Sequence, residues 1–347
     1  MADYIKKIIL CVLFVVFISI LIYSSILSYP VSCNDDDFIL HIKEGSNASS
    51  AAYILEENEC VSSSIFKIAT YLTFNQKNIK PGLYSLKGIR SLRDLMKIIT
   101  SVSNDKRTIT IFEGWKITDI AHSLSERLNI DKDVFIEHCY NKDFIKSLGI
   151  NYNVESLEGF LYPDTYVLLS TYTEKDIIRI LTKHFMDIFN KNINLSLNGN
   201  KLSVVEIITL ASIIQGEAMI VDEMPIISSV YHNRLKIGKE LEADPTILYY
   251  MSNDDLSKFM EQPGSKKSAK VFRKYKSIDN PYNTYMNKKL PIGPINNPGL
   301  DAMKAAINPK LLEKKYLYFV ADGTGGHIFS KTFKEHKNAI RKIRNGY

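Results

Sequence analysis

The longest apolar stretch of the chain, residues 8–29, constrains its fold more than any other feature. No charged side chain occurs between Lys7 and Asp35. An apolar run of this length, folded as a helix, matches the ~30 Å hydrocarbon core of a lipid bilayer. We therefore predict a single transmembrane helix over residues 8–29.

The charges that flank this run predict its orientation. Lys6 and Lys7 precede it, and three aspartates at positions 35–37 follow it. Positively charged flanks stay in the cytoplasm, so we expect residues 1–7 to form a cytoplasmic tail and the rest of the chain to be exported. The alternative is a cleaved signal peptide, whose apolar region normally spans about 7–15 residues and ends in a small-residue cleavage site. This run is longer and has no such site.

Composition narrows the choice of partners. The 347 residues are 45% hydrophobic and 24% charged, which is typical of a globular protein with room for one large or two modest domains. The net charge of +6 is mildly basic. Nucleic acid, anionic lipid and acidic cell-wall polymer all fit such a charge, and the apolar run favours the last two over nucleic acid.

A strongly apolar segment leads to a single carboxylate, Glu217. Ser203 and Glu206 form a capping box that predicts the start of a helix. Residues 207–214 are apolar almost all round, which is typical of a helix buried in a core. Glu217 should therefore lie poorly solvated near the negative end of that helix, and both effects raise the pKa of a carboxyl group. A raised pKa suits a general acid; the alternative is an ion-paired or surface glutamate.

Short motifs around Glu217 carry a family resemblance. Those closest to it are ASIIQGEA (211–218), YHNRL (231–235) and DPT (244–246). Upstream lie EGW (113–115) and LEGFLYPDTY (157–166), and downstream lie PYNTY (281–285), LPIGPINNPGL (290–300) and YFVADGTGGHIFS (318–330). With these motifs in this order, the chain resembles the bacterial endolytic murein transglycosylases of the YceG/MltG type.

The resemblance implies a fold of α+β class. It implies one N-terminal transmembrane helix, a small LysM-like module at residues 38–102 and an α+β catalytic domain at residues 108–347. The module would either bind glycan or act as a spacer. The implied location is the bacterial inner membrane, crossed once, with the catalytic domain in the periplasm or outside the cell.

The resemblance also implies an activity. The enzymes of this family cleave the MurNAc–GlcNAc bond within nascent peptidoglycan and terminate glycan elongation. Glu217 would be the catalytic acid and then the base that removes the proton from the muramic acid 6-hydroxyl, closing a 1,6-anhydro ring. The implied partners are glycan strands, the bilayer, and penicillin-binding or other wall-synthesis proteins. No cofactor, metal or nucleic acid is implied.

Polar and aromatic residues in the same motifs are candidates for binding sugar hydroxyls and faces, although each could instead support loop geometry. They are Glu158, Gln215, Asn233, Arg234, Asp244, Thr246, Asn283, Thr284 and Tyr285. Gln215 stands where the family often has a second glutamate, and its amide cannot transfer a proton, which favours Glu217 as the acid.

Two other functions stay open. The first is a glycan-binding scaffold for wall-synthesis enzymes that has lost catalysis, although the intact motif around Glu217 argues against it. The second is a muramidase, because ordinary glycosidases pair their acid with a second carboxylate. Glu158 would be that second carboxylate if it faced Glu217.

Hydrophobic periodicity predicts the remaining elements. Strands are expected at residues 38–42, around Tyr84 and at 109–112. A second helix after Glu217 should have Pro225 in its first turn and Gly238 just beyond its end. Further helices are expected at residues 51–57, 62–72, 91–99, 117–128, 133–148 and 173–190, with a polar loop at 191–201.

Three smaller features complete the predictions. The basic run at residues 265–276 is interpreted as a solvated loop rather than a polyanion site. The glycine-rich segment at 322–326 lacks the Gly-Lys-Ser/Thr of a phosphate loop and is interpreted as a turn that places His327 and Phe329. The four cysteines match no zinc or disulfide spacing; a Cys33–Cys60 bond is possible, but buried free thiols are favoured.

Overall fold

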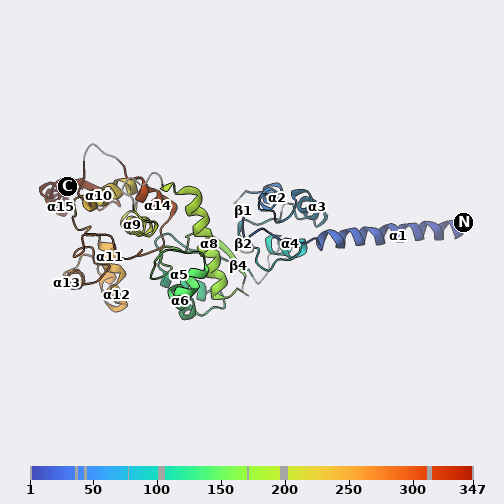
Figure 1. The fold of residues 1–347 in the computed structure, drawn as a ribbon, viewed down its shortest axis with the longest axis horizontal. Coiled ribbons are helices and arrows are strands. Elements are labelled where there is room, and N and C mark those ends of the chain that lie inside the picture. The colour runs from blue at the N-terminus through green and yellow to red at the C-terminus, as the bar shows by residue number, and fades with distance from the viewer. Residues whose placement is uncertain are drawn as a thin grey trace. The chain divides into compact units, whose positions relative to one another are not determined.

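The computed structural model describes residues 2–35, 38–42, 45–76, 78–100, 106–169, 172–195, 202–310 and 315–345. Two of the predicted flanking aspartates, at positions 36 and 37, and most of the predicted loop at 191–201 lie outside these residues. The chain divides into two compact units. The first is Met1–Thr110 with Thr165–Tyr172, and the second is Ile111–Asp164 with Thr173–Tyr347. Helices and short antiparallel strands occur in both, consistent with an α+β fold (Figure 1).

The apolar run forms α1 (Ala2–Leu27), one uninterrupted helix (Figure 1). Among the described residues, it is the one helix long and apolar enough to cross a membrane, a statement about length and composition only. The helix ends at Leu27, two residues before the predicted end of the span. Leu27 and Val31 are buried in the core of the first unit, and the Val31 N–H donates to the Arg90 carbonyl at 3.2 Å. The last residues of the predicted span therefore belong to a folded unit.

The rest of the first unit packs helices against a two-stranded antiparallel sheet. Strands β1 (Ile39–Ile42) and β2 (Gly82–Ser85) pair with Leu40 opposite Tyr84. The helices are α2 (Ala48–Glu57), α3 (Ser63–Leu72) and α4 (Leu92–Thr100). Leu40, Tyr84 and side chains from all three helices form one core. The predicted strands and helices are confirmed here, and α2 begins earlier because Asn47 caps it.

A second strand pair joins segments far apart in sequence. Strand β3 (Lys106–Thr110) pairs antiparallel with β4 (Thr165–Leu169), and both belong to the first unit. The strand predicted at residues 109–112 therefore starts earlier and ends where the second unit begins. The sequence analysis did not predict β4, a strand of five residues that begins at the end of the motif at 157–166.

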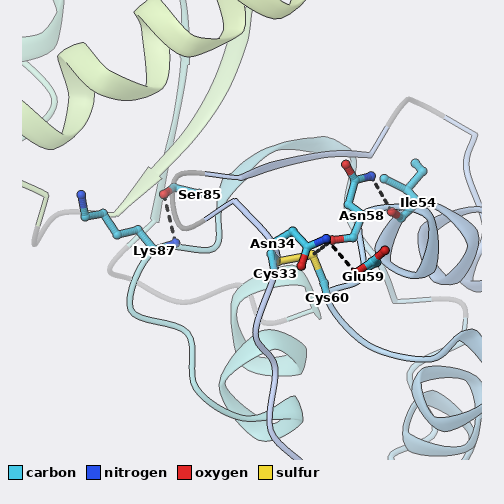
Figure 2. The surroundings of a disulfide bond; sticks show 8 residues. All are labelled: Cys33, Asn34, Ile54, Asn58, Glu59, Cys60, Ser85 and Lys87. Carbon is cyan, nitrogen blue, oxygen red and sulfur yellow. Dashed lines mark hydrogen bonds between the residues drawn. A yellow bond between two sulfur atoms is a disulfide. The ribbon is translucent and has the colours of Figure 1, made fainter. Parts of the chain in front are cut away.

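A disulfide joins Cys33 to Cys60 (Figure 2). Beside it, the Ser32 N–H donates to the Cys60 carbonyl at 3.2 Å, and Asn34 Nδ2 donates to Glu59 Oε2 at 2.7 Å. The expectation of buried free thiols is wrong for this pair and right for Cys139. Sequence spacing could not reveal the bond, because the chain after α1 meets the α2–α3 connection only in the folded unit.

The second unit holds most of the helices. These are α5 (Ile117–Ser125), α6 (Lys132–Tyr140), α7 (Lys142–Ser147), α8 (Glu174–Asn192), α9 (Val204–Glu217), the 3₁₀ turn η2 (Val221–Glu223), α10 (Met224–Lys236), α11 (Asp244–Tyr249), α12 (Asn253–Glu261), α13 (Lys266–Lys276), α14 (Leu300–Ile307) and α15 (Phe333–Arg344). Strands β5 (Tyr318–Ala321) and β6 (His327–Ser330) form a hairpin.

One predicted helix in this unit is two. The helix expected at residues 133–148 breaks at Asn141, whose backbone is extended with φ −76° and ψ 109°. Its side chain accepts a hydrogen bond from the Phe144 N–H at 2.9 Å, so Asn141 ends α6 and caps α7.

Helix α9 is the centre of the second unit. The predicted capping box is present, with Ser203 and Glu206 bonding each other's backbone N–H groups. Residues 207–214 are all buried, and α10, α11 and α14 lie against the helix (Figure 1). Its Ser212 hydroxyl accepts the Ile295 N–H at 3.0 Å. Because residues 207–214 are buried on every side, they fix the position from which the C-terminal turn of the helix continues.

The basic run predicted as a loop is instead helix α13. Ser265 caps it by accepting the Ser268 N–H at 3.1 Å. Tyr275 is buried, and Val271 and Phe272 pack into the same small cluster with residues of α11 and α12. The prediction was wrong because the charges masked an apolar face at helical spacing.

We predict that the disulfide stabilises the first unit. Closing a loop with a sequence separation of 27 residues should contribute about 3–4 kcal/mol in the chain-entropy model. Replacing both Cys33 and Cys60 by serine should lower the melting temperature of the full-length protein in detergent, as should a reductant. Cys11→Ser, at an exposed thiol, is the control. Mass spectrometry of denatured, unreduced protein should find two alkylated cysteines, and four would contradict the bond.

Candidate active site

Glu217 is the last residue of α9 and lines a cavity of about 510 Å³ in the second unit. The cavity walls come from α9, α10, the start of α11, the loop before α14, the β5–β6 hairpin and α15. They combine polar groups with aromatic rings. Prominent among them are Arg234, Asp244, Tyr285, Tyr318, Phe319 and His327.

Two donors hold the Glu217 carboxyl group. The Tyr231 hydroxyl donates to Glu217 Oε1 at 2.8 Å, and the Asp244 backbone N–H also bonds this side chain. Burial raises the pKa of Glu217 to about 8, and the nearby Asp244 charge adds to the rise, while Tyr231 and Arg234 oppose it. The predicted rise in pKa is therefore confirmed. At neutral pH the group holds a proton that it can give to a ligand.

A glycine beside Glu217 permits this arrangement. A Cβ atom on Gly216 would lie 2.9 Å from Pro245 Cβ, closer than such atoms approach. Its absence lets the first turn of α11 pack against the last turn of α9. The Asp244 N–H thereby reaches Glu217, where it offsets part of the cost of ionising a carboxyl group at a helix C-terminus.

Arg234 of α10 ties three segments together beside the cavity. Its Nε donates to the Leu317 carbonyl at 2.7 Å, and its Nη1 donates to Glu242 Oε2 at 2.7 Å. The guanidinium lies 5.1 Å from the centroid of the Tyr318 ring. The charge is thus paired and fixed, and it connects the hairpin to the loop that leads to α11.

Asp244 and Tyr285 form the neighbouring wall. The Tyr285 hydroxyl donates to Asp244 Oδ1. Burial raises the pKa of Asp244, while this hydrogen bond and the Lys276 charge oppose the rise. The Lys276 ammonium sits 3.5 Å from the Tyr285 ring centroid. Helix α13, unexpected from the sequence, therefore supplies a cation that holds a cavity aromatic.

Three other predicted ligands are buried supports outside the cavity lining. The Thr284 hydroxyl accepts the Ala243 N–H at 3.0 Å and lies 2.9 Å from the Thr246 hydroxyl. Asn283 Nδ2 donates to the Ile278 carbonyl at 2.8 Å. These bonds fix the loops on which Asp244 and Tyr285 are mounted.

The last three predicted ligands also bond protein groups outside the cavity lining. Asn233 Nδ2 donates to the Tyr316 carbonyl at 3.0 Å. Gln215 Oε1 accepts the Gly299 N–H at 3.0 Å. The Glu158 side chain accepts from the Ile117 N–H and from Asn297 Nδ2, each at 3.0 Å.

Glu158 is thus buried, only 3% exposed, and burial raises its pKa to about 8. The structure brings Glu217, Arg234, Asp244 and Tyr285 together around the cavity and leaves Glu158 out of it.

Sequence reasoning overlooked Tyr231 and the hairpin. Tyr231 stands one turn before Arg234 in a motif already noted. The hairpin turn is held by Asp322, which accepts the Thr324 N–H at 2.7 Å, with Gly323 and Gly325 at positive φ. The expected turn is therefore present, and it delivers His327 to the cavity. Within the described residues, no three His, Cys, Asp or Glu side chains are grouped to hold a metal ion.

We predict that Tyr231→Phe raises the pKa of Glu217 above about 8. The lost hydrogen bond favours the ionised carboxylate, so its removal makes the proton harder to release. A ¹³C NMR titration of the glutamate carboxyl signals should show the change. Tyr318→Phe, which alters a cavity residue without a bond to Glu217, should leave that pKa in place; an unchanged titration in Tyr231→Phe would contradict the assignment.

Comparison with known proteins identifies the family of the chain. The profile of the YceG-like family matches residues 40–342. An endolytic murein transglycosylase of Bacillus subtilis (strain 168) is 31% identical over 337 residues, covering 92% of this chain and 89% of that protein. One from Streptococcus pneumoniae (strain ATCC BAA-255 / R6) is 27% identical, and the match spans 57% of its length. The crystal structure of a yceG-like protein from Listeria monocytogenes has a TM-score of 0.56 and 29% identity, covering 87% of this chain and 98% of that one. The chain therefore belongs to the YceG-like family.

Proposed function

We propose that this chain is a membrane-anchored endolytic murein transglycosylase. It cleaves the MurNAc–GlcNAc bond within nascent peptidoglycan and terminates glycan elongation. The observation that carries the proposal is Glu217, a carboxyl group with a pKa of about 8 that faces a cavity lined with aromatic and polar groups. Relatives that match nearly the whole chain, and that bear this enzyme name, support the same activity.

The reaction uses Glu217 twice. Its proton passes to the glycosidic oxygen as the bond from that oxygen to C1 of the muramic acid breaks. The carboxylate left behind then accepts the proton of the 6-hydroxyl, while that oxygen bonds to C1 and closes the 1,6-anhydro ring. Tyr231 and the Asp244 N–H stabilise the carboxylate between the two steps. The proton is recovered, and water is not consumed.

The cavity supplies the groups that a saccharide requires. Tyr285, Tyr318 and Phe319 offer flat apolar faces for sugar rings, and Arg234 and Asp244 offer charged groups for hydroxyls. We assign direct contact with the glycan to Arg234, Asp244 and Tyr285. We assign the other predicted ligands, which bond the backbone of neighbouring loops, to support of these walls.

A muramidase is the second candidate, and Asp244 is the observation that favours it. This carboxyl group lies close enough to Glu217 to raise its pKa, whereas Glu158 is buried among protein donors. Hydrolysis would use Asp244 as the second carboxylate of an ordinary glycosidase. Its bond to Tyr285 and its burial favour a supporting role instead. The products distinguish the two reactions, and an absence of products would indicate the scaffold.

The location follows from the same proposal. Helix α1 anchors the protein in the bacterial inner membrane with its N-terminus in the cytoplasm, and residues 38–102 form a LysM-like module before the catalytic domain. The Cys33–Cys60 disulfide supports export, because such bonds persist in oxidising compartments. The partners are peptidoglycan strands and wall-synthesis proteins of the penicillin-binding type.

We predict that Glu217→Gln leaves a folded protein with activity reduced by about 10²–10⁴-fold. The amide keeps the shape of the side chain and loses the transferable proton. For the wild type, kcat/KM should fall about tenfold per pH unit above about pH 8, as Glu217 loses its proton. Mass spectrometry of digested glycan strands should find 1,6-anhydro ends, lighter by one water than hydrolysis products.

Glu158→Gln is the matched control for this experiment, because it changes a second buried carboxyl group with a raised pKa and should retain activity. Reducing ends in the wild-type digest would establish the muramidase instead. Normal turnover by Glu217→Gln would overturn the proposed mechanism.

We also predict the topology. Alkaline phosphatase fused to the C-terminus should be active in intact cells, because the flanking lysines hold the N-terminus inside. A fluorescent protein that folds only in the cytoplasm, fused at the same position, should stay dark. The fusion protein should remain with the membranes after a carbonate wash, and a released fragment beginning near Ser32 would indicate a cleaved signal peptide.

A further inference from the structure

His327, which lines the same cavity, is paired with Glu223, and the mechanism above does not use this pair. His327 begins β6 and lines the cavity together with Glu217. Glu223 ends the 3₁₀ turn η2, shortly after α9 and 104 residues before His327. The pair therefore links the segment that follows the catalytic helix to the hairpin.

Glu223 makes two hydrogen bonds to His327. Its Oε2 lies 2.7 Å from His327 Nδ1, and its Oε1 accepts the His327 backbone N–H at 3.1 Å. A carboxylate can only accept hydrogen bonds, so Nδ1 carries the proton. In the neutral ring, Nε2 is then an acceptor. Two contacts to one residue fix both the tautomer and the direction of the ring.

The neighbouring residues leave space for these two hydrogen bonds. A Cβ atom on Gly326 would lie 3.2 Å from Glu223 Oε1 and 3.0 Å from Asp322 Oδ2. Glycine at this position leaves room for the carboxylate beside the turn. The Phe319 ring meets the His327 ring edge-on, with centroids 5.2 Å apart and planes at 90°. The imidazole thus contacts the Glu223 carboxylate and the Phe319 ring.

One ring nitrogen is left over. The His327 side chain is 7% exposed, and among the described residues no hydrogen-bond partner meets its Nε2. The backbone N–H and Nδ1 of His327 are sufficient to link the hairpin to Glu223, so that link does not need Nε2. An oriented acceptor at the wall of a cavity is suited to a ligand that brings hydroxyl donors, which is what a saccharide presents.

We propose that His327 is a substrate-positioning residue, whose Nε2 accepts a hydrogen bond from a hydroxyl of the glycan, with Glu223 holding the tautomer that makes this possible. The inference rests on the proposed function, because the ligand class is the glycan of that reaction. It adds a polar contact from the hairpin to the wall formed by Arg234, Asp244 and Tyr285.

Two variants separate this role from a structural one. Asparagine at 327 places its amide where Nδ1 was and keeps the bond to Glu223, but it offers nothing at Nε2. Glutamine reaches the Nε2 position and gives up the Nδ1 contact. A substrate contact requires His327→Asn to lose glycan binding and His327→Gln to retain it. If His327 has only a structural role, His327→Asn should keep the melting temperature of the parent, and His327→Gln should lower it.

Binding is measured by calorimetry with purified glycan oligomers on the full-length Glu217→Gln protein in detergent, so that no turnover occurs. His327→Asn in that background should weaken binding roughly two- to tenfold, the worth of one hydrogen bond, with an unchanged melting temperature. His327→Gln should stay within about twofold of the parent. Asp222→Asn, at the exposed carboxylate next to Glu223, is the control. Equal binding by the parent and His327→Asn overturns the proposal.

A second measurement needs no substitution at 327. In ¹⁵N NMR of the Glu217→Gln protein, the Nε2 resonance of His327 should shift when glycan oligomers are added, and Nδ1 should remain protonated. An Nε2 resonance that stays unmoved at saturating glycan overturns the contact. If the Glu217→Gln parent binds no glycan at all, the proposed function fails, and the ligand class fails with it.

Discussion

The burial of α9 on all sides is the constraint on which the site depends. A helix whose residues 207–214 are all buried cannot rotate or tilt without exposing apolar surface, at roughly 25 cal/mol per Å². Its last residue is therefore held in one place. Protein atoms around this turn also bury the carboxyl group, and that burial is the main cause of the pKa of about 8 of Glu217.

Neighbouring groups act on the pKa of Glu217 in opposite directions. The Asp244 charge raises the pKa of Glu217, and the Arg234 charge, the Tyr231 hydroxyl and a backbone N–H lower it. Two of these groups also bond residues other than Glu217: Asp244 bonds Tyr285, and Arg234 bonds Glu242 and the Leu317 carbonyl. These groups adjust a pKa that burial has already raised, and a pKa of about 8 suits a group that must release and recover a proton in one reaction.

The hairpin and α13 show how distant segments complete a site. The turn at residues 322–326 is built from aspartate bonds and glycines at positive φ, which place His327 and Phe319 against the cavity. Helix α13 hides an apolar face behind its lysines and delivers Lys276 to the Tyr285 ring. The carboxyl group that invited comparison with a muramidase, Glu158, instead holds the start of α5 and the Asn297 loop. Glu158 and Glu217 both have a raised pKa, so residue type and burial alone could not identify which of them faces the cavity.

The sequence by itself determined the local features: the apolar helix α1, the capping box of α9, the turn before His327 and the raised pKa of Glu217. Each follows from interactions within a few residues or from hydrophobic period, which a linear sequence records. Only the tertiary structure decided that Cys33 meets Cys60, that β4 pairs with β3, and that Tyr231, Asp244 and His327 surround the acid while Glu158 does not. Those contacts join residues that lie 14 or more positions apart in the sequence, and their energies come from packing and burial, which no local pattern encodes.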